Sequence, residues 1–358
     1  MDPLTHTLVG ASLTATRLGK KTRLATPALV IGANLPDIDV LAYFRGGDFA
    51  LGFRRGWTHG ALALVVLPAL LAGLLMLWGR WRHGGRDSPP LSPGWLLGLC
   101  YLACLTHPFL DWLNNYGLRW WMPFRDTWYY GDSVFIMDPY LWLILGLGWV
   151  IGRRPAKISG ITAALMAGLV IWLVGSRAPA YLPIVASVFG VLLLAFLWRP
   201  RTRWLSAHRA ATTGLILGGT YIGIMISLHA FTVPRVGAEL QHRGLAPYAE
   251  LMAGPTPANP LAWDIVVAAD GVYRWGRYDW RHRSLVMSQA ELPAARSSPY
   301  WNEISASGQS AGFLRWTRFP WFETDPANLH TSIYLMDARY TRSRTGGFGA
   351  TKIDLVTD

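Results

Sequence analysis

Charged residues and cysteines are both scarce in this sequence, and each shortage excludes a class of protein. Only 15% of the 358 residues are charged and 52% are hydrophobic, whereas about a quarter of the residues in an ordinary soluble domain carry a charge. The two cysteines, Cys100 and Cys104, lie one helical turn apart in an apolar stretch, so no disulfide framework is available. The composition therefore excludes an ordinary soluble domain and a disulfide-rich secreted scaffold.

Acidic residues are fewer than basic ones, 21 against 33, which leaves a net charge of +12. The basic residues are nevertheless divided among short clusters between apolar runs, and no nucleic-acid recognition motif accompanies them. We therefore expect no nucleic-acid partner. The 19 tryptophans and 37 glycines are typical of a membrane protein with several spanning segments and aromatic residues at the membrane interfaces.

The apolar runs predict about eight membrane segments, of which the first two are short. They are expected from Pro3 to near Arg17, over Leu24–Leu35, from His59 to about Trp78, over Trp95–Leu113, from Pro139 to about Ile151, and over Ile158–Gly175, Tyr181–Trp198 and Ala211–Phe231.

The pattern changes after these runs to alternating β-branched and aromatic residues separated by turns. Ala269-Asp270-Gly271 predicts a hairpin turn between two strands, and residues 313–319, 332–339 and 352–356 are expected to form further strands. The predicted fold is an α-helical polytopic membrane domain over residues 1–231, followed by a small, mainly β extracytoplasmic domain over residues 232–358.

Four basic clusters set the predicted topology, because lysine and arginine are enriched in cytoplasmic loops. The clusters are Arg17/Lys20/Lys21/Arg23, Arg80/Arg82/Arg86, Arg153/Arg154/Lys157 and Arg199/Arg201/Arg203/Arg209. With eight spans, both termini and the β domain are then expected on the outer side of the cytoplasmic membrane. The histidine and aspartate motifs described below fall on the same side.

The pair His107 and Asp111 lies at the end of an apolar run and is spaced to share one helix face. An ionisable side chain inside a membrane helix costs about 2.5–3.5 kcal/mol on insertion scales, so it needs a partner or a function. An imidazole and a carboxylate on one face are common ligands of zinc and similar ions. The alternative is a hydrogen bond between the two side chains that merely neutralises both.

Further histidines and aspartates gather at the same predicted ends of the first five segments. Together with the pair they are His6, His59, His107, Asp37, Asp39, Asp111 and Asp138. Such a thiolate-free set suits zinc, manganese or iron, and several aspartates allow one or two ions. Asp37 and Asp39 could instead form a solvated loop, and Asp138 could simply cap a helix.

The order of the motifs resembles the YdjM-like family of membrane-bound, metal-dependent hydrolases. The matching stretches are Thr5-His6, Pro36–Asp39, Arg55–His59 and His107–Asp111, and Asn114–Gly117, Trp121–Phe124 and Asp138-Pro139 look like its longer members. The resemblance covers about residues 1–150. It implies a divalent-metal hydrolase whose metal ligands match His6, Asp37, Asp39, His59, His107 and Asp111.

The sequence hypothesis is therefore a hydrolase at the outer face of the inner membrane that cleaves a lipid-linked or amphiphilic phosphoester, with an ester or amide as the nearer alternative. Zinc is expected first, and manganese or iron are alternatives. Asp39 or Asp111 would bind the ion or act as a base, and Arg119 or Arg125 would lie near the leaving anion. The supporting residues are expected to be Asp2, Asn114 and Asp138.

Two other functions fit the same residues. One is a transporter, although its polar residues would be expected near mid-membrane rather than at one face. The other is a structural protein in which a metal ion joins the short N-terminal helices to the bundle and the β domain binds a partner that the sequence does not identify.

Overall fold

The computed structural model describes residues 1–81, 89–151, 182–198, 206–298, 301–306, 308, 310–324, 332–341 and 348–354. The chain divides into two compact units. The helical unit comprises Met1–Ile38 and Arg55–Ile226, and the C-terminal unit comprises Asp39–Arg54 and Ser227–Asp358. The predicted apolar segment Ile158–Gly175 lies outside the described residues.

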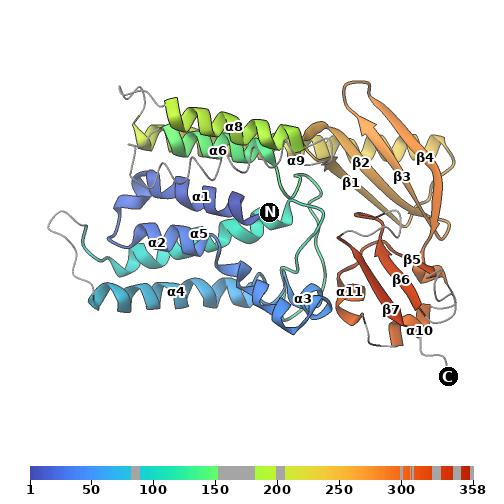
Figure 1. The fold of residues 1–358 in the computed structure, drawn as a ribbon, viewed down its shortest axis with the longest axis horizontal. Helices are drawn as coiled ribbons and strands as arrows, with labels where there is room; N and C mark the ends of the chain where they lie inside the picture. The colour runs from blue at the N-terminus through green and yellow to red at the C-terminus, as the bar shows by residue number, and fades with distance from the viewer. Residues whose placement is uncertain are drawn as a thin grey trace. The chain divides into compact units, whose positions relative to one another are not determined.

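The helical unit is a bundle whose helices run roughly parallel to one another (Figure 1). Helix α1 packs against α2 and α6, α5 packs against α2 and α4, and α8 packs against α6. Its elements are α1 (Pro3–Ala15), η1 (Arg17–Lys20), α2 (Ala25–Gly32), the start of η2 (Leu35–Arg45), α4 (Ala61–Trp81), α5 (Pro93–Trp112), α6 (Pro139–Ile151), α8 (Leu182–Trp198) and the first part of α9 (Ala207–His242).

Small residues let these helices approach closely. A Cβ atom added to Gly32 would lie 2.9 Å from the Cβ of Ala103, which places α2 directly against α5. Gly148 of α6 and Gly214 of α9 face each other in the same way, since an added Cβ on either would come within 3.0 Å of the other residue's Cα. Close contact through glycine and alanine is the usual way in which membrane helices pack.

Three of the described helices, α4, α5 and α9, are long and apolar enough to cross a membrane, and the pair α2 and η2, bent by 46°, would make a fourth. The predicted segments at α1, α6 and α8 are also helical, but they are shorter than a typical membrane span. Helices α1 and α6 have 13 residues each, and α8 has 17. A helix of 13 residues is about 20 Å long, less than the hydrocarbon core of a bilayer at about 30 Å. The structure thus confirms a helical unit with three or four candidate membrane spans among the described residues, and the expected eight spans remain a prediction.

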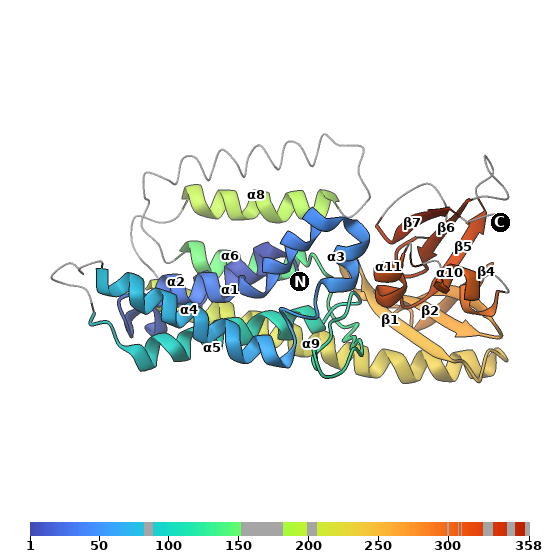
Figure 2. The same ribbon diagram turned by 90° about the horizontal axis from the view of Figure 1, so that it is seen from below.

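The C-terminal unit contains two antiparallel sheets, visible in Figure 2. The first has the strand order β1–β2–β3–β4, and the second has the order β5–β6–β7. The strands are β1 (Glu250–Thr256), β2 (Asn259–Ala269), β3 (Val272–Asp279), β4 (Ser284–Pro293), β5 (Pro320–Thr324), β6 (Ser332–Asp337) and β7 (Ala350–Asp354), with short helices η3 (Ala295–Ser297), α10 (Trp301–Ala306) and α11 (Ala311–Trp316).

The two sheets share an aromatic core built around Tyr273, Trp275, Phe319 and Trp321. The indole of Trp275 also donates a hydrogen bond of 3.0 Å to the carbonyl of Ala338, which ties the first sheet to the end of the second.

Several sequence predictions for this unit can be compared directly with the structure. The turn at Ala269-Asp270-Gly271 is confirmed, because Ala269 pairs with Val272 and both Asp270 (φ 53°) and Gly271 (φ 74°) adopt the left-handed conformation that this turn requires. The strand expected at 332–339 is present as β6, and the described part of the strand expected at 352–356 belongs to β7, while residues 355 and 356 lie outside the described residues. The strand expected at 313–319 is wrong, since most of that stretch belongs to helix α11.

Helix α9 also extends further than its apolar run, through residue 231 to His242. Its last turns are held in the C-terminal unit by Val236 and Leu240, which are fully buried, and by a hydrogen bond of 2.9 Å from the indole of Trp280 to the hydroxyl of Thr232.

Candidate metal centre

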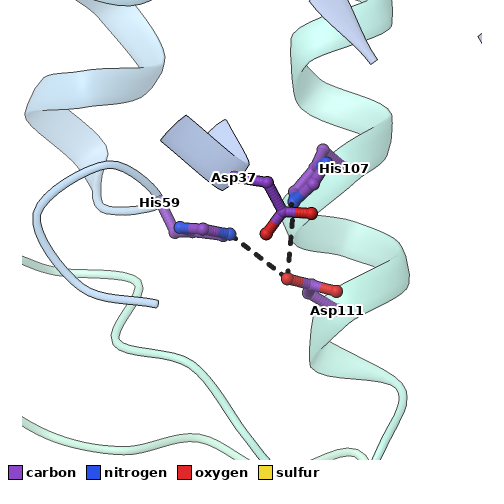
Figure 3. Close-up of side chains that lie close together, drawn as sticks. All are labelled: Asp37, His59, His107 and Asp111. Atoms are coloured by element: carbon purple, nitrogen blue, oxygen red, sulfur yellow. Dashed lines mark ion pairs between the residues drawn. The ribbon is translucent and has the colours of Figure 1, made fainter. Parts of the chain in front are cut away.

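Four side chains from three parts of the helical unit point toward one another (Figure 3). Asp37 lies on η2, His59 lies in the turn before α4, and His107 and Asp111 lie on α5. One nitrogen or oxygen atom from each of the four lies within 4.8 Å of the others. The sequence predicted all four as metal ligands, and the structure brings them together.

The ring of His107 is oriented by a backbone carbonyl. Its Nδ1 lies 2.7 Å from the carbonyl oxygen of Ala33. Because a carbonyl oxygen can only accept, Nδ1 carries the proton, and Nε2 of the neutral ring has a lone pair that faces the cluster.

The Nε2 atom of His107 faces one carboxylate oxygen of Asp37 and one of Asp111. Nε2 of His107 lies 3.6 Å from Oδ1 of Asp37 and 3.5 Å from Oδ2 of Asp111. Among the described residues, neither Nε2 of His107 nor Oδ2 of Asp111 has a hydrogen-bond partner, and both atoms are buried. Three electron-rich atoms therefore converge on one point, an arrangement that is stable only when a cation, either a proton or a metal ion, lies between them.

His59 presents its Nε2 atom to the same carboxylate, 3.2 Å from Oδ2 of Asp111. Its other ring nitrogen, Nδ1, lies 3.0 Å from the hydroxyl of Thr58. When Nδ1 donates its proton to that hydroxyl, the lone pair on Nε2 faces the cluster. This is the arrangement in which histidine binds metal ions, with its second nitrogen hydrogen-bonded to a neighbour.

The two oxygens of Asp111 have different surroundings. Oδ2 faces the imidazoles of His59 and His107, and the ion pairs drawn in Figure 3 join these three residues. Oδ1 is held on the other side by the Met1 amino group, by Nε2 of His6 at 3.2 Å and by the guanidinium of Arg55 at 3.2 Å. One oxygen is thus neutralised by neighbours, and the other is left for the cluster.

Arg55 is a site residue that the sequence reasoning did not single out. Besides its ion pair with Asp111, its Nη1 donates a hydrogen bond of 3.1 Å to Oδ1 of Asn114, and its guanidinium lies 4.4 Å from the ring centre of Tyr116. The signal was available, because Arg55 opens the Arg-Gly-Trp-Thr-His motif that also contains the ligand His59.

His6 lies beside the cluster. Its ring stacks on that of His107 with the centroids 3.7 Å apart and the planes inclined by 16°. Its contact is with the neutralised oxygen of Asp111, and it does not belong to the group of four. Asp2, expected among the supporting residues, caps α1 through the Thr5 amide and accepts a hydrogen bond from the indole of Trp142.

Asp39, predicted as a ligand or a base, lies outside the group of four, and its carboxylate accepts a hydrogen bond of 3.0 Å from Nε of Arg54. Arg119 is buried and donates a hydrogen bond of 2.7 Å to the carboxylate of Asp126. Arg125 is exposed on the loop that follows α5.

Two of the residues expected to support the ligands have clear structural roles. Asn114 fixes Arg55, as described above, and its Oδ1 also accepts from the Tyr116 amide. Asp138 caps α6 through the Leu141 amide at 3.1 Å and accepts a hydrogen bond of 2.8 Å from the Tyr221 hydroxyl. Burial raises the pKa of Asp138 to about 6, and these hydrogen bonds limit the rise.

The donor set fits a divalent metal ion. Two imidazole nitrogens and two carboxylates are ligands that zinc, manganese and iron accept, and three of the four residues are fully buried. The lone pair of His107 aimed at two carboxylate oxygens provides the place where a cation is required. The structure therefore supports a metal site of this composition.

Comparison with known proteins agrees with this picture. The model of the family described as "YdjM inner membrane protein" matches residues 1–181, about half of the chain and the part that contains the four clustered residues. The chain is also 25% identical over 151 residues to the uncharacterized protein YfhP of Bacillus subtilis, a match that covers 40% of this chain and 43% of YfhP. No solved structure matches the chain.

Proposed function

The chain belongs to the YdjM family of inner membrane proteins, and we propose that it is a membrane-embedded hydrolase that depends on a divalent metal ion. The observation that carries this proposal is the orientation of His107, whose Nδ1 is held by a backbone carbonyl and whose Nε2 faces two carboxylate oxygens in a buried cluster. These atoms need a cation between them, and a metal ion bound to the lone pair of the neutral ring would supply it.

Asp37, His59, His107 and Asp111 would hold the ion, with zinc as the first expectation and manganese or iron as alternatives. When bound in such a site, a divalent cation lowers the pKa of water toward about 7 and polarises the carbonyl or phosphoryl oxygen of a substrate. Arg55 would keep Oδ1 of Asp111 occupied, so that Oδ2 alone faces the ion.

Asp37 marks the side from which a substrate would enter. Its side chain is 19% exposed, whereas those of the two histidines and Asp111 are fully buried. The sequence neighbours Ile38 and Trp57 are 48% and 49% exposed, so apolar surface flanks two of the ligand-bearing segments. This combination supports an amphiphilic substrate, such as a lipid-linked phosphoester or ester. The Asp37 carboxylate is also placed to accept a proton from an incoming water molecule.

The location of the basic residues supports a site at the outer face of the membrane. Lys21 lies over the ring of Trp95, at the beginning of α5, and Arg23 donates a hydrogen bond to the carbonyl of Gly79. His107 follows Trp95 by twelve residues along the same helix, which corresponds to about 18 Å. The basic end and the cluster thus lie toward opposite ends of α5, as expected if the basic end is cytoplasmic.

The experiment that tests this proposal is turnover by the purified full-length protein, loaded with Zn²⁺ or Mn²⁺, on a panel of lipid phosphoesters and carboxylic esters. Asp111→Ala should abolish both metal binding and turnover, whereas Asp264→Ala, which removes an aspartate on the surface of the C-terminal unit, should change neither. Turnover retained in Asp111→Ala would overturn the assignment.

The burial of the cluster also favours a second function, in which the ion is a structural link. The four ligands come from η2, the turn before α4 and α5, so a bound ion would join three segments of the helical unit. This alternative predicts that removing the metal unfolds the helical unit and that no substrate of either class is turned over.

A further inference from the structure

Residues 39–54 connect two parts of the metal centre but belong to the other unit of the protein. The chain leaves the helical unit after Ile38 and returns to it at Arg55. Asp37 therefore lies two residues before this segment, and Arg55 follows it directly. We call residues 39–54 the docked loop.

The two ends of the docked loop are joined to each other. Oδ1 of Asp39 accepts a hydrogen bond of 3.0 Å from Nε of Arg54, and the side chain of Asp39 is fully buried. The guanidinium of Arg54 also lies 5.5 Å from the ring centre of Tyr43 within the loop. A charged pair at this position fixes the separation between the points where the chain leaves and re-enters the helical unit.

The far part of the docked loop is anchored to the C-terminal unit by α3 (Gly47–Phe53). The carboxylate of Asp48 accepts a hydrogen bond of 3.0 Å from the amide of Gly312 and one of 2.8 Å from that of Phe313. A Cβ atom on Gly312 would lie 1.8 Å from the carbonyl oxygen of Asp48, and one on Gly52 would lie 2.8 Å from the Cα of Gly312. Backbone therefore packs on backbone, and no side chain fits between α3 and α11.

We propose that the C-terminal unit positions the metal centre through the docked loop, with Asp48, Gly312 and the Asp39–Arg54 pair as positioning residues. Anchoring at Asp48 holds the loop, the ion pair fixes its two ends, and the ends set the placement of Asp37 and Arg55. This inference rests on the proposed function in so far as it concerns metal binding. It also explains why Asp39, which stands in a ligand-like motif, pairs with an arginine.

The test compares Gly312→Ala and Asp48→Ala with the matched control Gly254→Ala, all in the full-length protein in detergent. Gly254 lies in β1, and a Cβ added there meets nothing within 4 Å. Hydrogen exchange of residues 35–38 and 55–60 is measured without metal, and Zn²⁺ affinity is measured by titration. We expect faster exchange in both segments and Zn²⁺ affinity weaker by about tenfold or more in the two test variants, as for other residues that support metal ligands. The control should match the wild type.

The expected changes must be local for the inference to hold. Exchange in β2 and β3 should stay at the wild-type level. If a test variant loses that protection, Asp48→Asn, which keeps one of the two acceptor oxygens, replaces it and should give an intermediate effect. If residues 39–54 exchange faster in a test variant while residues 35–38 and 55–60 exchange as in the wild type, the inference is overturned. A wild type that binds no Zn²⁺, but in which Gly312→Ala still loosens both segments, would contradict the proposed function and leave the positioning role standing.

Discussion

His107 shows how a single hydrogen bond can decide what a side chain does. Its spacing from Asp111 allowed both a metal ligand and a simple hydrogen-bonded pair. The carbonyl of Ala33 accepts a hydrogen bond from Nδ1, so Nε2 is the nitrogen that faces Asp37 and Asp111 and, in the neutral ring, carries the lone pair that a metal ion binds. Ala33 lies at the end of α2, so this information comes from a contact between segments that the sequence alone does not reveal.

Arg55 leads to the first prediction at this scale. Replacing it with alanine leaves the buried carboxylate of Asp111 without its guanidinium partner, and breaking a buried ion pair in this way costs about 3–5 kcal/mol. Arg55→Lys should also be destabilising, because lysine lacks the planar fork that reaches both Asp111 and Asn114. Thermal unfolding in detergent measures both effects, with the exposed Arg125→Ala as the control. A lysine variant as stable as the wild type would contradict this role.

The candidate site could be predicted from the sequence to the extent that its residues carry recognisable chemistry. Residue type, spacing and a shared predicted side of the membrane identified His59, His107, Asp37 and Asp111. Asp39 looked equally suitable but pairs with Arg54, and Arg55 was overlooked. Each depends on a contact with a residue fifteen or more positions away, between Asp39 and Arg54 or between Arg55 and Asp111. Local sequence does not contain such contacts.

At the scale of elements, α6 and α9 meet where two glycines face each other. Gly148→Ala would place a Cβ 2.9 Å from the Cα of Gly214, whereas Gly219 of α9 has open space around it. Alanine is favoured over glycine in a helix by about 1 kcal/mol, but overpacking a close contact costs about 1–3 kcal/mol. Gly148→Ala should therefore lower the melting temperature, and Gly219→Ala should leave it equal or raise it. The opposite order would show that α6 and α9 do not pack in this way.

Helix α11 shows why one element was predicted wrongly. Residues 313–319 alternate in a way that favours a strand, yet 311–316 form a helix. The amides of Gly312 and Phe313 are satisfied by Asp48, which lies 264 and 265 positions earlier in the chain. Strands β2, β3 and β6 were predicted correctly because their turn residues and alternating pattern lie within the segments themselves.

Asp337, at the end of β6, predicts how the stability of the C-terminal unit depends on pH. Burial alone would raise the pKa of this carboxyl, but the ion pair with Arg339 and a hydrogen bond from Thr317 hold the pKa below its ordinary value. The resulting stabilisation is complete above the unfolded-state pKa of about 3.9 and is lost as the pH falls through the lower, folded-state pKa.

The measurement compares the unfolding free energy of wild type and Asp337→Asn between pH 7 and pH 2. We expect the wild type to be more stable at pH 7 and the difference to shrink below pH 4, by at most about 1.4 kcal/mol per pH unit. A difference that stays constant over this range would show that Asp337 keeps an ordinary pKa in the folded protein.

At the scale of the whole molecule, membership of the YdjM family establishes an inner membrane protein, and the side of the membrane that the metal centre faces is a prediction. In a background with Cys100 and Cys104 replaced by alanine, the variant Trp121→Cys should react with a membrane-impermeant maleimide in intact cells. The variant Lys20→Cys should react only after the inner membrane is made permeable. The reverse pattern would place the cluster on the cytoplasmic side.

The central claim is that Asp37, His59, His107 and Asp111 bind a divalent metal ion. The most direct test is the metal content of detergent-purified protein, prepared without chelators and measured by plasma mass spectrometry beside a His107→Ala/Asp111→Ala variant. The account predicts about one or two equivalents of zinc, manganese or iron in the wild type and none in the variant, with the C-terminal unit still folded. A wild type free of metal, or a variant that keeps it, would contradict the claim.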